Sequence, residues 1–212
     1  MKVTIVDYGT SNLKSVCRGL AVCGADMTVA TRPEEIENAE IIVLPGVGAY
    51  GDCARRLRER NLEPVLQKFF QRERPFLGIC VGMQLLLDSS TEYGPCEGLG
   101  KIPGQVREIP RQDSYGKRHV PHIGWEILTR PPGAADWKGT LLDGIDEEDS
   151  VYFVHSYTAW PDDESDRLAD AYHDGSRIAA VLNRGAVYGC QFHPEKSGPV
   201  GLKILSNFLN LV

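Results

Sequence analysis

Short apolar runs alternate with helix-forming stretches through the first 80 residues, and this order constrains the fold more than any other feature of the sequence. Strands are expected at residues 3–7, 27–30, 41–44 and 76–79, and helices at residues 13–23, 34–38 and 52–72. Asn12 and Asn61 are the expected N-cap residues of two of these helices. Because the first and third runs are almost entirely apolar, both strands should be buried on both faces, which predicts a parallel sheet covered by helices.

The second half of the sequence changes to short strands separated by polar turns. Strands are expected at residues 101–109, 119–128, 151–154, 168–172, 178–182 and 186–191, and an amphipathic helix at residues 202–209. We expect this half to be antiparallel or mixed. A chain of 212 residues suits one domain, residues 1–212, that buries roughly 70% of the surface its unfolded form exposes. The predicted fold is a single-domain α/β fold with a mixed, mostly parallel sheet flanked by helices.

Composition and charge exclude several classes of function. The net charge of -6 disfavours a nucleic-acid partner. The N-terminal residues 1–7 are typical of a strand and not of a signal peptide, and we expect no membrane partner. The six cysteines are scattered without a Cys-x-x-Cys pair, which favours a reducing cytoplasm.

A cysteine lies where an expected strand meets an expected helix. The apolar run 75–77 leads into Gly-Ile-Cys-Val-Gly (78–82), and helix-forming residues 83–87 follow. Glycines two residues before and after Cys80 allow the backbone to crowd there, as at the nucleophile elbow of serine hydrolases. The following helix would direct its N-terminal amides at the sulfur and favour the reactive thiolate. A lone cysteine after an apolar strand is more often an inert core residue, so this motif is not decisive alone.

A histidine and a glutamate near the end of the chain complete a possible triad. His193 and Glu195 are separated by one proline, which pushes the residue before it towards extended geometry. Side chains two apart then point the same way, so the carboxylate can orient the imidazole while the other ring nitrogen reaches the Cys80 sulfur. The turn Pro-Gly-Val-Gly (45–48) is either a plain turn or, with the amide of Val81, part of an oxyanion hole.

The spacing of His119 and His122 resembles that of some zinc-binding pairs. No third ligand stands at useful spacing in the sequence. We therefore interpret the pair as part of a solvent-exposed loop, and we predict no metal and no cofactor.

Together these motifs resemble those of the class I, triad-type glutamine amidotransferases. The segments that carry the resemblance are residues 7–9, Asn12, and residues 45–48, 78–84, 121–125, 152–157 and 191–197. The elbow and the His-Pro-Glu sequence are typical of the whole class. The Pro-His-x-Gly-Trp and Tyr-Phe-Val-His-Ser-Tyr segments are similar to those of one family within it, the glutaminase subunits of imidazole glycerol phosphate synthase.

The resemblance implies a flavodoxin-like fold and a glutaminase that needs no cofactor or metal. The residues that it places in the site are Cys80, His193 and Glu195 as catalytic residues; Val81, Val47 and Gly46 at the oxyanion hole, Val47 after a peptide reorientation; and Gly48, Gln84, Ser156 and Tyr157 as glutamine contacts. It also implies a heterodimer with a (β/α)8-barrel synthase that uses the ammonia in histidine biosynthesis. The implied contact residues are Asn12, Trp125, Tyr152 and Lys196.

Two positions depart from the family pattern. Ser11 stands where the family usually has glycine, and Glu126 stands where asparagine is usual. Both lie in segments that the resemblance places towards the partner, so a related ammonia-dependent synthase of sugar metabolism stays open. The same triad would also serve a stand-alone cysteine hydrolase acting on γ-glutamyl bonds. A non-catalytic subunit, and the glutaminase of another synthase such as that for pyridoxal phosphate, are two more hypotheses for such a chain.

Overall fold

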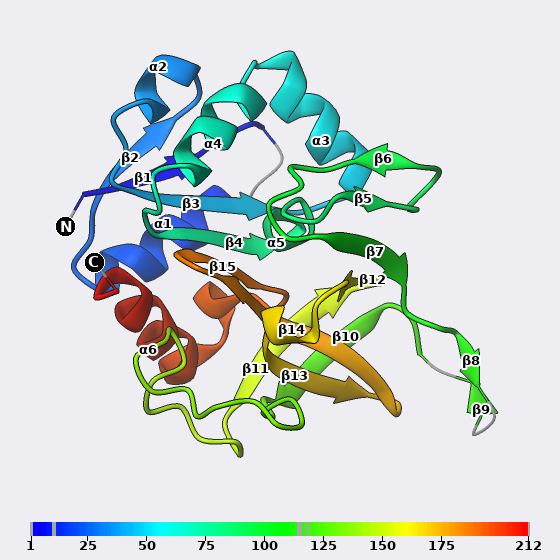
Figure 1. The fold of residues 1–212 in the computed structure, drawn as a ribbon. Helices are drawn as coiled ribbons and strands as arrows, with labels where there is room; N and C mark the ends of the chain where they lie inside the picture. The colour runs from blue at the N-terminus through cyan, green and yellow to red at the C-terminus, as the bar shows by residue number, and fades with distance from the viewer. Residues whose placement is uncertain (1, 10–11, 114–115, 118, 212) are drawn as a thin grey trace.

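The computed structural model describes residues 2–9, 12–113, 116–117 and 119–211, and its largest element is a seven-stranded sheet (Figure 1). Its strands are β1 Lys2–Val6, β2 Asp26–Ala30, β3 Ile41–Gly46, β4 Phe76–Cys80, β13 Arg167–His173, β14 Ser176–Arg184 and β15 Val187–Cys190. They lie in the order β13-β14-β15-β4-β3-β1-β2. The pairs from β15 to β2 are parallel, whereas β14 is antiparallel to both of its neighbours. The predicted mixed, mostly parallel sheet is confirmed.

The parallel part has the strand order of a flavodoxin-like fold, with β1 between β2 and β3 and with β4 and β15 following. Every residue of β3 and β4 is buried, as the continuous apolar runs predict. In this kind of sheet ligands bind beyond the carboxyl ends of the strands. Cys80 is the last residue of β4 and therefore lies at that edge.

Helices cover both faces of the sheet. Their bounds are α1 Leu13–Val22, α2 Pro33–Ile36, α3 Tyr50–Glu59, α4 Glu63–Phe70, α5 Val81–Gln84 and α6 Gly198–Leu209. The helices α1 and α6 contact each other on one face, and α3 and α4 lie on the other (Figure 1). Each longer helix turns an apolar stripe towards the sheet; in α6 this stripe contains Ile204, Leu205 and Phe208.

Smaller sheets flank the carboxyl edge of the large one. A four-stranded sheet has the order β12-β7-β5-β6, and two ribbons are formed by β10 with β11 and by β8 with β9. The bounds are β5 Ser89–Ser90, β6 Cys96–Glu97, β7 Gly104–Glu108, β8 Gln112–Asp113, β9 Gly116–Lys117, β10 His122–Ile127, β11 Ser150–His155 and β12 Tyr157–Pro161. Two short 3-10 helices are η1 Glu164–Asp166 and η2 Pro194–Lys196. Among the described residues, no helix has the length and apolar character needed to span a membrane.

Asn12 is the N-cap residue of α1, as expected, although its side chain makes no capping hydrogen bond. Two local expectations differ from the structure. Asn61 is not an N-cap: its φ of 54° is left-handed, a conformation that asparagine tolerates, and Leu62 occupies the N-cap of α4. The helix expected at residues 83–87 begins at Val81 and ends at Gln84. Ser11 lies outside the described residues.

Candidate active site

Cys80 lies at a sharp turn between β4 and α5. Its φ of 54° and ψ of -112° are unusual for a residue with a side chain, and strain of this kind is common at nucleophile elbows. The flanking glycines are required by close packing of the backbone. A Cβ atom on Gly82 would lie 1.8 Å from the carbonyl oxygen of Leu44, and one on Gly78 would lie 2.6 Å from the carbonyl oxygen of Gly82. The structure therefore has the elbow that the sequence predicts.

The turn at residues 45–48 lies beside this elbow. Gly46 is the register partner of Cys80 on the neighbouring strand, and a Cβ atom on Gly46 would lie 3.0 Å from Cβ of Val81. Gly48 has a φ of 104°, which favours glycine. The two segments expected to form an oxyanion hole are thus adjacent in space.

His193 and Glu195 form a buried pair at the start of η2. Nδ1 of His193 lies 2.8 Å from Oε1 of Glu195, and the side chain of Glu195 is fully buried. The backbone of this segment is held in place by the β10–β11 ribbon: the N–H of His193 donates to the carbonyl oxygen of Tyr152 at 3.0 Å. The Ser197 hydroxyl donates to the carbonyl oxygen of His193 at 2.7 Å. The imidazole orientation is therefore fixed by both a carboxylate and the backbone.

The imidazole of His193 interacts with Cys80 as well as with Glu195. Burial lowers the pKa of His193, but its side-chain interactions with Cys80 and Glu195 outweigh burial and raise the pKa to about 9. A protonated imidazole stabilises negative charge on the neighbouring sulfur. Nε2 of His193 has no hydrogen bond of ordinary geometry to any described residue, so its interaction with the sulfur is not well aligned. Such contacts often align only when substrate binds.

Cys80 and His193 line one cavity of about 300 Å³ at the carboxyl edge of the sheet. The cavity is also lined by residues that the family resemblance assigns to glutamine or to the oxyanion hole: Val47, Gly48, Val81, Gln84, Ser156 and Tyr157. Gly46 is buried in β3 behind the lining. A cavity of this size suits a small molecule.

Gln191 and His155 also hold this cavity together, and neither was predicted to have a role. The amide nitrogen of Gln84 donates to the carbonyl oxygen of Tyr157 at 2.9 Å and to Oε1 of Gln191 at 3.0 Å. Nε2 of Gln191 lies 3.8 Å from Sγ of Cys80. His155 also lines the cavity, and its Nδ1–H donates to the same carbonyl oxygen of Tyr157 at 2.8 Å. Gln191 lies two residues before His193, but β15 ends at Cys190 and the chain bends at residues 191–192, so strand alternation gave no signal for it.

The four residues expected to contact a partner lie in different surroundings. Trp125 is 53% exposed on β10, and its ring centroid is 5.8 Å from that of its cross-strand partner Tyr152. Lys196 is exposed at the rim of the cavity. Asn12 is half-buried at the start of α1.

The interpretation of His119 and His122 as one exposed loop is wrong for the second residue. The side chain of His119 is 93% exposed, whereas His122 begins β10 and is fully buried. Strand alternation turns His122 inwards, where its ring stacks on those of Phe153 and His173.

Comparison with known proteins agrees with this geometry. The family model for "Glutamine amidotransferase class-I" matches residues 4–211. The chain belongs to the class-I glutamine amidotransferase family. Two solved structures share the fold: PurLQS from Thermotoga maritima, with a TM-score of 0.73 at 23% identity over 99% of this chain and 97% of that chain, and a glutamine amidotransferase, with a TM-score of 0.71 at 18% identity over 98% and 97%.

Relatives of higher identity carry a more particular name. The chain is 46% identical over 210 residues to "Imidazole glycerol phosphate synthase subunit HisH 1" of Legionella pneumophila (strain Lens), covering 99% of each chain. It is 44% identical over 213 residues to "Imidazole glycerol phosphate synthase subunit HisH" of Geobacter sulfurreducens, covering 98% of this chain and 97% of that protein. The resemblance stated from the motifs is confirmed.

Proposed function

We propose that this chain is the glutaminase subunit of an imidazole glycerol phosphate synthase, and that it supplies ammonia to a synthase subunit in histidine biosynthesis. The observation that carries the proposal is the arrangement of Cys80 with the His193–Glu195 pair in one cavity. Full-length similarity to subunits of that name supports it. The six cysteines are scattered without a Cys-x-x-Cys pair, and on this ground we place the enzyme in a reducing cytoplasm.

In the first half of the reaction the Cys80 thiolate attacks the side-chain amide carbon of glutamine. The negative charge that develops on the amide oxygen is stabilised by the N–H of Val81. The N–H of Val47 also stabilises it, once the peptide bond between Gly46 and Val47 has reoriented. His193, protonated at neutral pH, donates its proton to the departing nitrogen, and the carbon–nitrogen bond breaks. Ammonia leaves, and a glutamyl thioester remains on the sulfur.

In the second half water cleaves the thioester. His193 is now neutral and accepts a proton from the attacking water, while the same amides stabilise the oxyanion. The carbon–sulfur bond breaks and restores the thiolate beside the imidazolium, and the released γ-carboxylic acid loses its proton to solvent as glutamate leaves. Glu195 keeps the imidazole in the productive tautomer through both steps.

Free ammonia becomes ammonium in water, so the reaction needs a partner that receives it directly. The outer face of β10 presents three apolar side chains at alternate positions: Ile123 is 58% exposed, Trp125 53% and Ile127 49%. Exposed apolar side chains grouped in this way are typical of protein interfaces. We propose that this face, with Tyr152, Asn12 and Lys196, contacts a (β/α)8-barrel synthase subunit.

The proposal is tested by combining the full chain with the synthase subunit and measuring imidazole glycerol phosphate formed from glutamine or from added ammonium. Cys80→Ala should abolish synthesis from glutamine and leave synthesis from ammonium unchanged, because only the first needs the thiolate. Cys96→Ala, which removes a cysteine on β6 away from the cavity, should leave both unchanged. Loss of both activities in Cys80→Ala would contradict the proposed division of labour. Full glutaminase activity without the partner would instead indicate a stand-alone hydrolase.

A further inference from the structure

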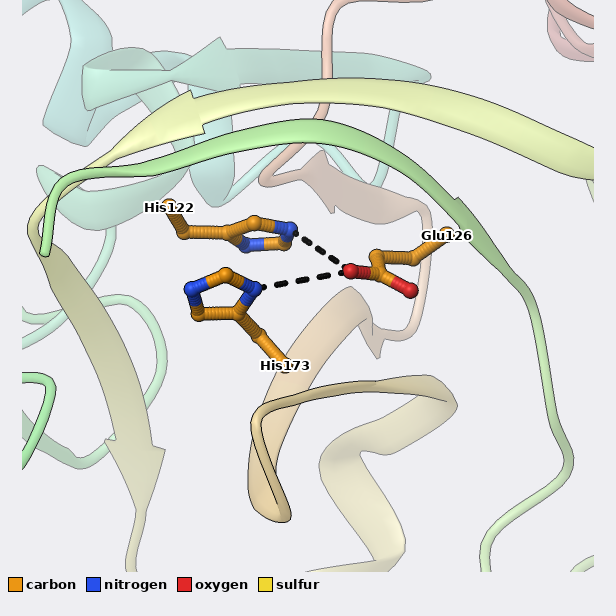
Figure 2. Close-up of side chains that lie close together, drawn as sticks. All are labelled: His122, Glu126 and His173. Carbon is orange, nitrogen blue, oxygen red and sulfur yellow. Dashed lines mark hydrogen bonds and ion pairs between the residues drawn. The ribbon is translucent and has the colours of Figure 1, made fainter. Parts of the chain in front are cut away.

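Two histidines and a glutamate meet between β10 and β13, apart from the Cys80 cavity. His122 is the first residue of β10, Glu126 lies on the same inward face of that strand, and His173 is the last residue of β13. Nε2 of His122 lies 3.4 Å from Oε1 of Glu126, and Nδ1 of His173 lies 3.5 Å from the same oxygen. Figure 2 shows the two imidazole rings stacked, with the carboxylate of Glu126 beside both of them.

Hydrogen bonds on the far side of each ring assign its tautomer. Nδ1 of His155 lies 2.8 Å from the carbonyl oxygen of Tyr157, which can only accept, so Nδ1 of His155 carries the proton and its Nε2 is an acceptor. Nδ1 of His122 lies 3.0 Å from that Nε2 and therefore donates to it. Nε2 of His173 lies 2.7 Å from the carbonyl oxygen of His119 and also donates.

The consequence is that both rings turn a lone pair towards the carboxylate. When neutral, His122 has its lone pair on Nε2 and His173 has its lone pair on Nδ1, and these are the two atoms that face Glu126. His122 is fully buried, and its Nε2 has no hydrogen-bond partner among the described residues. Burying such an acceptor without a partner is unfavourable. Two imidazole nitrogens and a carboxylate oxygen that lie this close together form a place that a cation can occupy.

We propose that His122, Glu126 and His173 bind a divalent transition-metal ion of the zinc type. Imidazole nitrogen and carboxylate oxygen are ordinary ligands of zinc, whereas magnesium and calcium prefer oxygen alone. Atoms bound about 2.0–2.1 Å from a tetrahedral zinc ion lie about 3.3 Å from each other. The 3.4 Å and 3.5 Å contacts are close to this value, and the three ligand atoms all lie within 4.8 Å of one another. Three protein ligands leave one position for water.

The stacked rings must separate slightly to bind an ion. A nitrogen lone pair lies in the plane of its ring, and the two ring planes are now only 20° apart with centroids separated by 4.0 Å. His173 has the freer ring, because its side chain is 12% exposed and it lies at the turn of the β13–β14 hairpin. A rotation of this ring would direct both lone pairs at one ion.

A proton is the competing occupant of this position. The hydrogen bonds from His122 to His155 and from His155 to the carbonyl oxygen of Tyr157 keep the lone pair of a neutral His122 on Nε2. A bond from His122 to an acceptor on its far side is the arrangement that commonly orients a histidine ligand of a metal.

The position of this metal site would connect it with two other parts of the molecule. Glu126 and His122 lie on the inner face of the strand whose outer face we propose as the partner contact. The ion would join β10 to the β13–β14 hairpin and so support that strand from behind. On its other side His122 is linked through His155 to the carbonyl oxygen of Tyr157, at the wall of the Cys80 cavity. The metal would thus be structural, without contact to the substrate.

Zinc binding by the full chain, freed of metal and without an affinity tag, tests the proposal. Because a cysteine thiolate also binds zinc, all variants are made in a Cys80→Ser background. We expect one Zn²⁺ per chain by isothermal titration calorimetry and no binding of Mg²⁺. Loss of a group that only orients a metal ligand weakens metal affinity by about 10- to 100-fold. Because Glu126→Gln changes a proposed ligand itself, it should weaken zinc binding by at least this factor. Bound Co²⁺ should show no thiolate charge-transfer absorption.

His119→Ala is the matched control. It removes the side chain of a nearby exposed histidine but keeps the backbone carbonyl oxygen, which is the only atom of His119 that contacts the cluster. It should bind zinc as tightly as its parent, and zinc should raise the thermal unfolding midpoint of both but not of Glu126→Gln. His173→Asn provides a second variant if Glu126→Gln fails to fold. Absence of stoichiometric zinc binding would show that a proton fills the position and would overturn the proposal. Binding that survives both ligand substitutions, or that His119→Ala weakens equally, would also overturn it.

Discussion

At the scale of single residues, the state of the site depends on the buried contact between His193 and Glu195. An imidazole in a buried place normally loses its proton, yet Glu195 and the sulfur of Cys80 reverse this effect. The side chains of His193 and Glu195 are 3% and 0% exposed, so water screens their attraction little. In the proposed mechanism, this protonated ring donates to the leaving nitrogen and stabilises the thiolate.

This raised pKa predicts a pH-dependent stability. His193 has a pKa of about 9 in the folded chain against the ordinary value of 6.5, so the folded chain holds the proton over this range while the unfolded chain releases it. The stabilisation is complete below pH 6.5 and is lost as the pH rises through 9. The difference corresponds to stability on the order of 3 kcal/mol.

Urea unfolding of the wild type and of the double variant His193→Gln/Glu195→Gln, at pH 6 and pH 9.5, measures this contribution. The double variant removes the pair without leaving one buried charge unpaired. The stability advantage of the wild type should be large at pH 6 and small at pH 9.5. An advantage that stays constant, or that grows with pH, would contradict the assignment.

At the scale of elements, the elbow depends on close contact between α5 and β3. The helix α5 can begin directly after β4 only because Gly82 lies against the carbonyl oxygen of Leu44. This contact also holds Val81, whose N–H we assign to the oxyanion hole, next to the turn at residues 45–48. The packing of one glycine thus determines the relative position of two parts of the site.

Gly82→Ala should therefore destabilise the chain by roughly 3 kcal/mol or more, because the added Cβ would collide with backbone that cannot move without separating β3 from α5. Gly51→Ala is the matched control, since a Cβ there meets nothing within 4 Å and the residue lies in α3. It should stabilise the chain by about 0.5–1 kcal/mol, as alanine does in helices. Chemical unfolding of both variants measures the contrast. Equal effects would show that the elbow packing is not what requires glycine.

At the scale of the whole molecule, the β10–β11 ribbon links the surface to the site. Its outer face carries Trp125, and its backbone holds His193 through the carbonyl oxygen of Tyr152. At its end, the residues after Val154 form part of the cavity wall. A partner that contacts this ribbon would therefore act on the same element that positions His193, the histidine that we propose as catalytic. This arrangement offers a direct physical route from partner binding to glutamine hydrolysis.

Trp125→Ala should weaken binding of the synthase subunit by roughly 30-fold or more, the effect of losing a central aromatic residue worth about 2 kcal/mol. The fold should be unaffected because Trp125 is half exposed. Trp160→Ala is the control, because it removes the same side chain from a different surface. Trp160 is 41% exposed and lies on β12 in the four-stranded sheet. Calorimetric titration with the synthase subunit compares the two. If both variants bind as the wild type does, the proposed contact face is wrong.

Much of this architecture could be predicted from local patterns in the sequence. Continuous apolar runs identified β1, β3 and β4, and the glycines around Cys80 identified the elbow. That Cys80 and His193 meet follows from the pairing of β4 with β15, which places the ends of both strands side by side. Gln191 was missed because its role depends on an amide from α5, which no local pattern reveals.

The strand β10 shows why other features could not be predicted. Its apolar side chains point outwards and its polar ones inwards, opposite to an ordinary half-buried strand, so alternation alone could not place His122 in the interior. The partners of His122, which are Glu126, His155 and His173, come from three strands. Only tertiary structure brings them together.

The role of Cys80 as the nucleophile that attacks glutamine is central to the proposed function, and covalent labelling tests it most directly. The chain is incubated with an electrophilic glutamine analogue, such as a diazoketone, and the labelled residue is located by peptide mass spectrometry. We predict one label per chain, on Cys80, with protection by glutamine and slower labelling in Glu195→Gln. A label on any of the other five cysteines, or labelling of Cys80 that glutamine does not slow, would contradict this role.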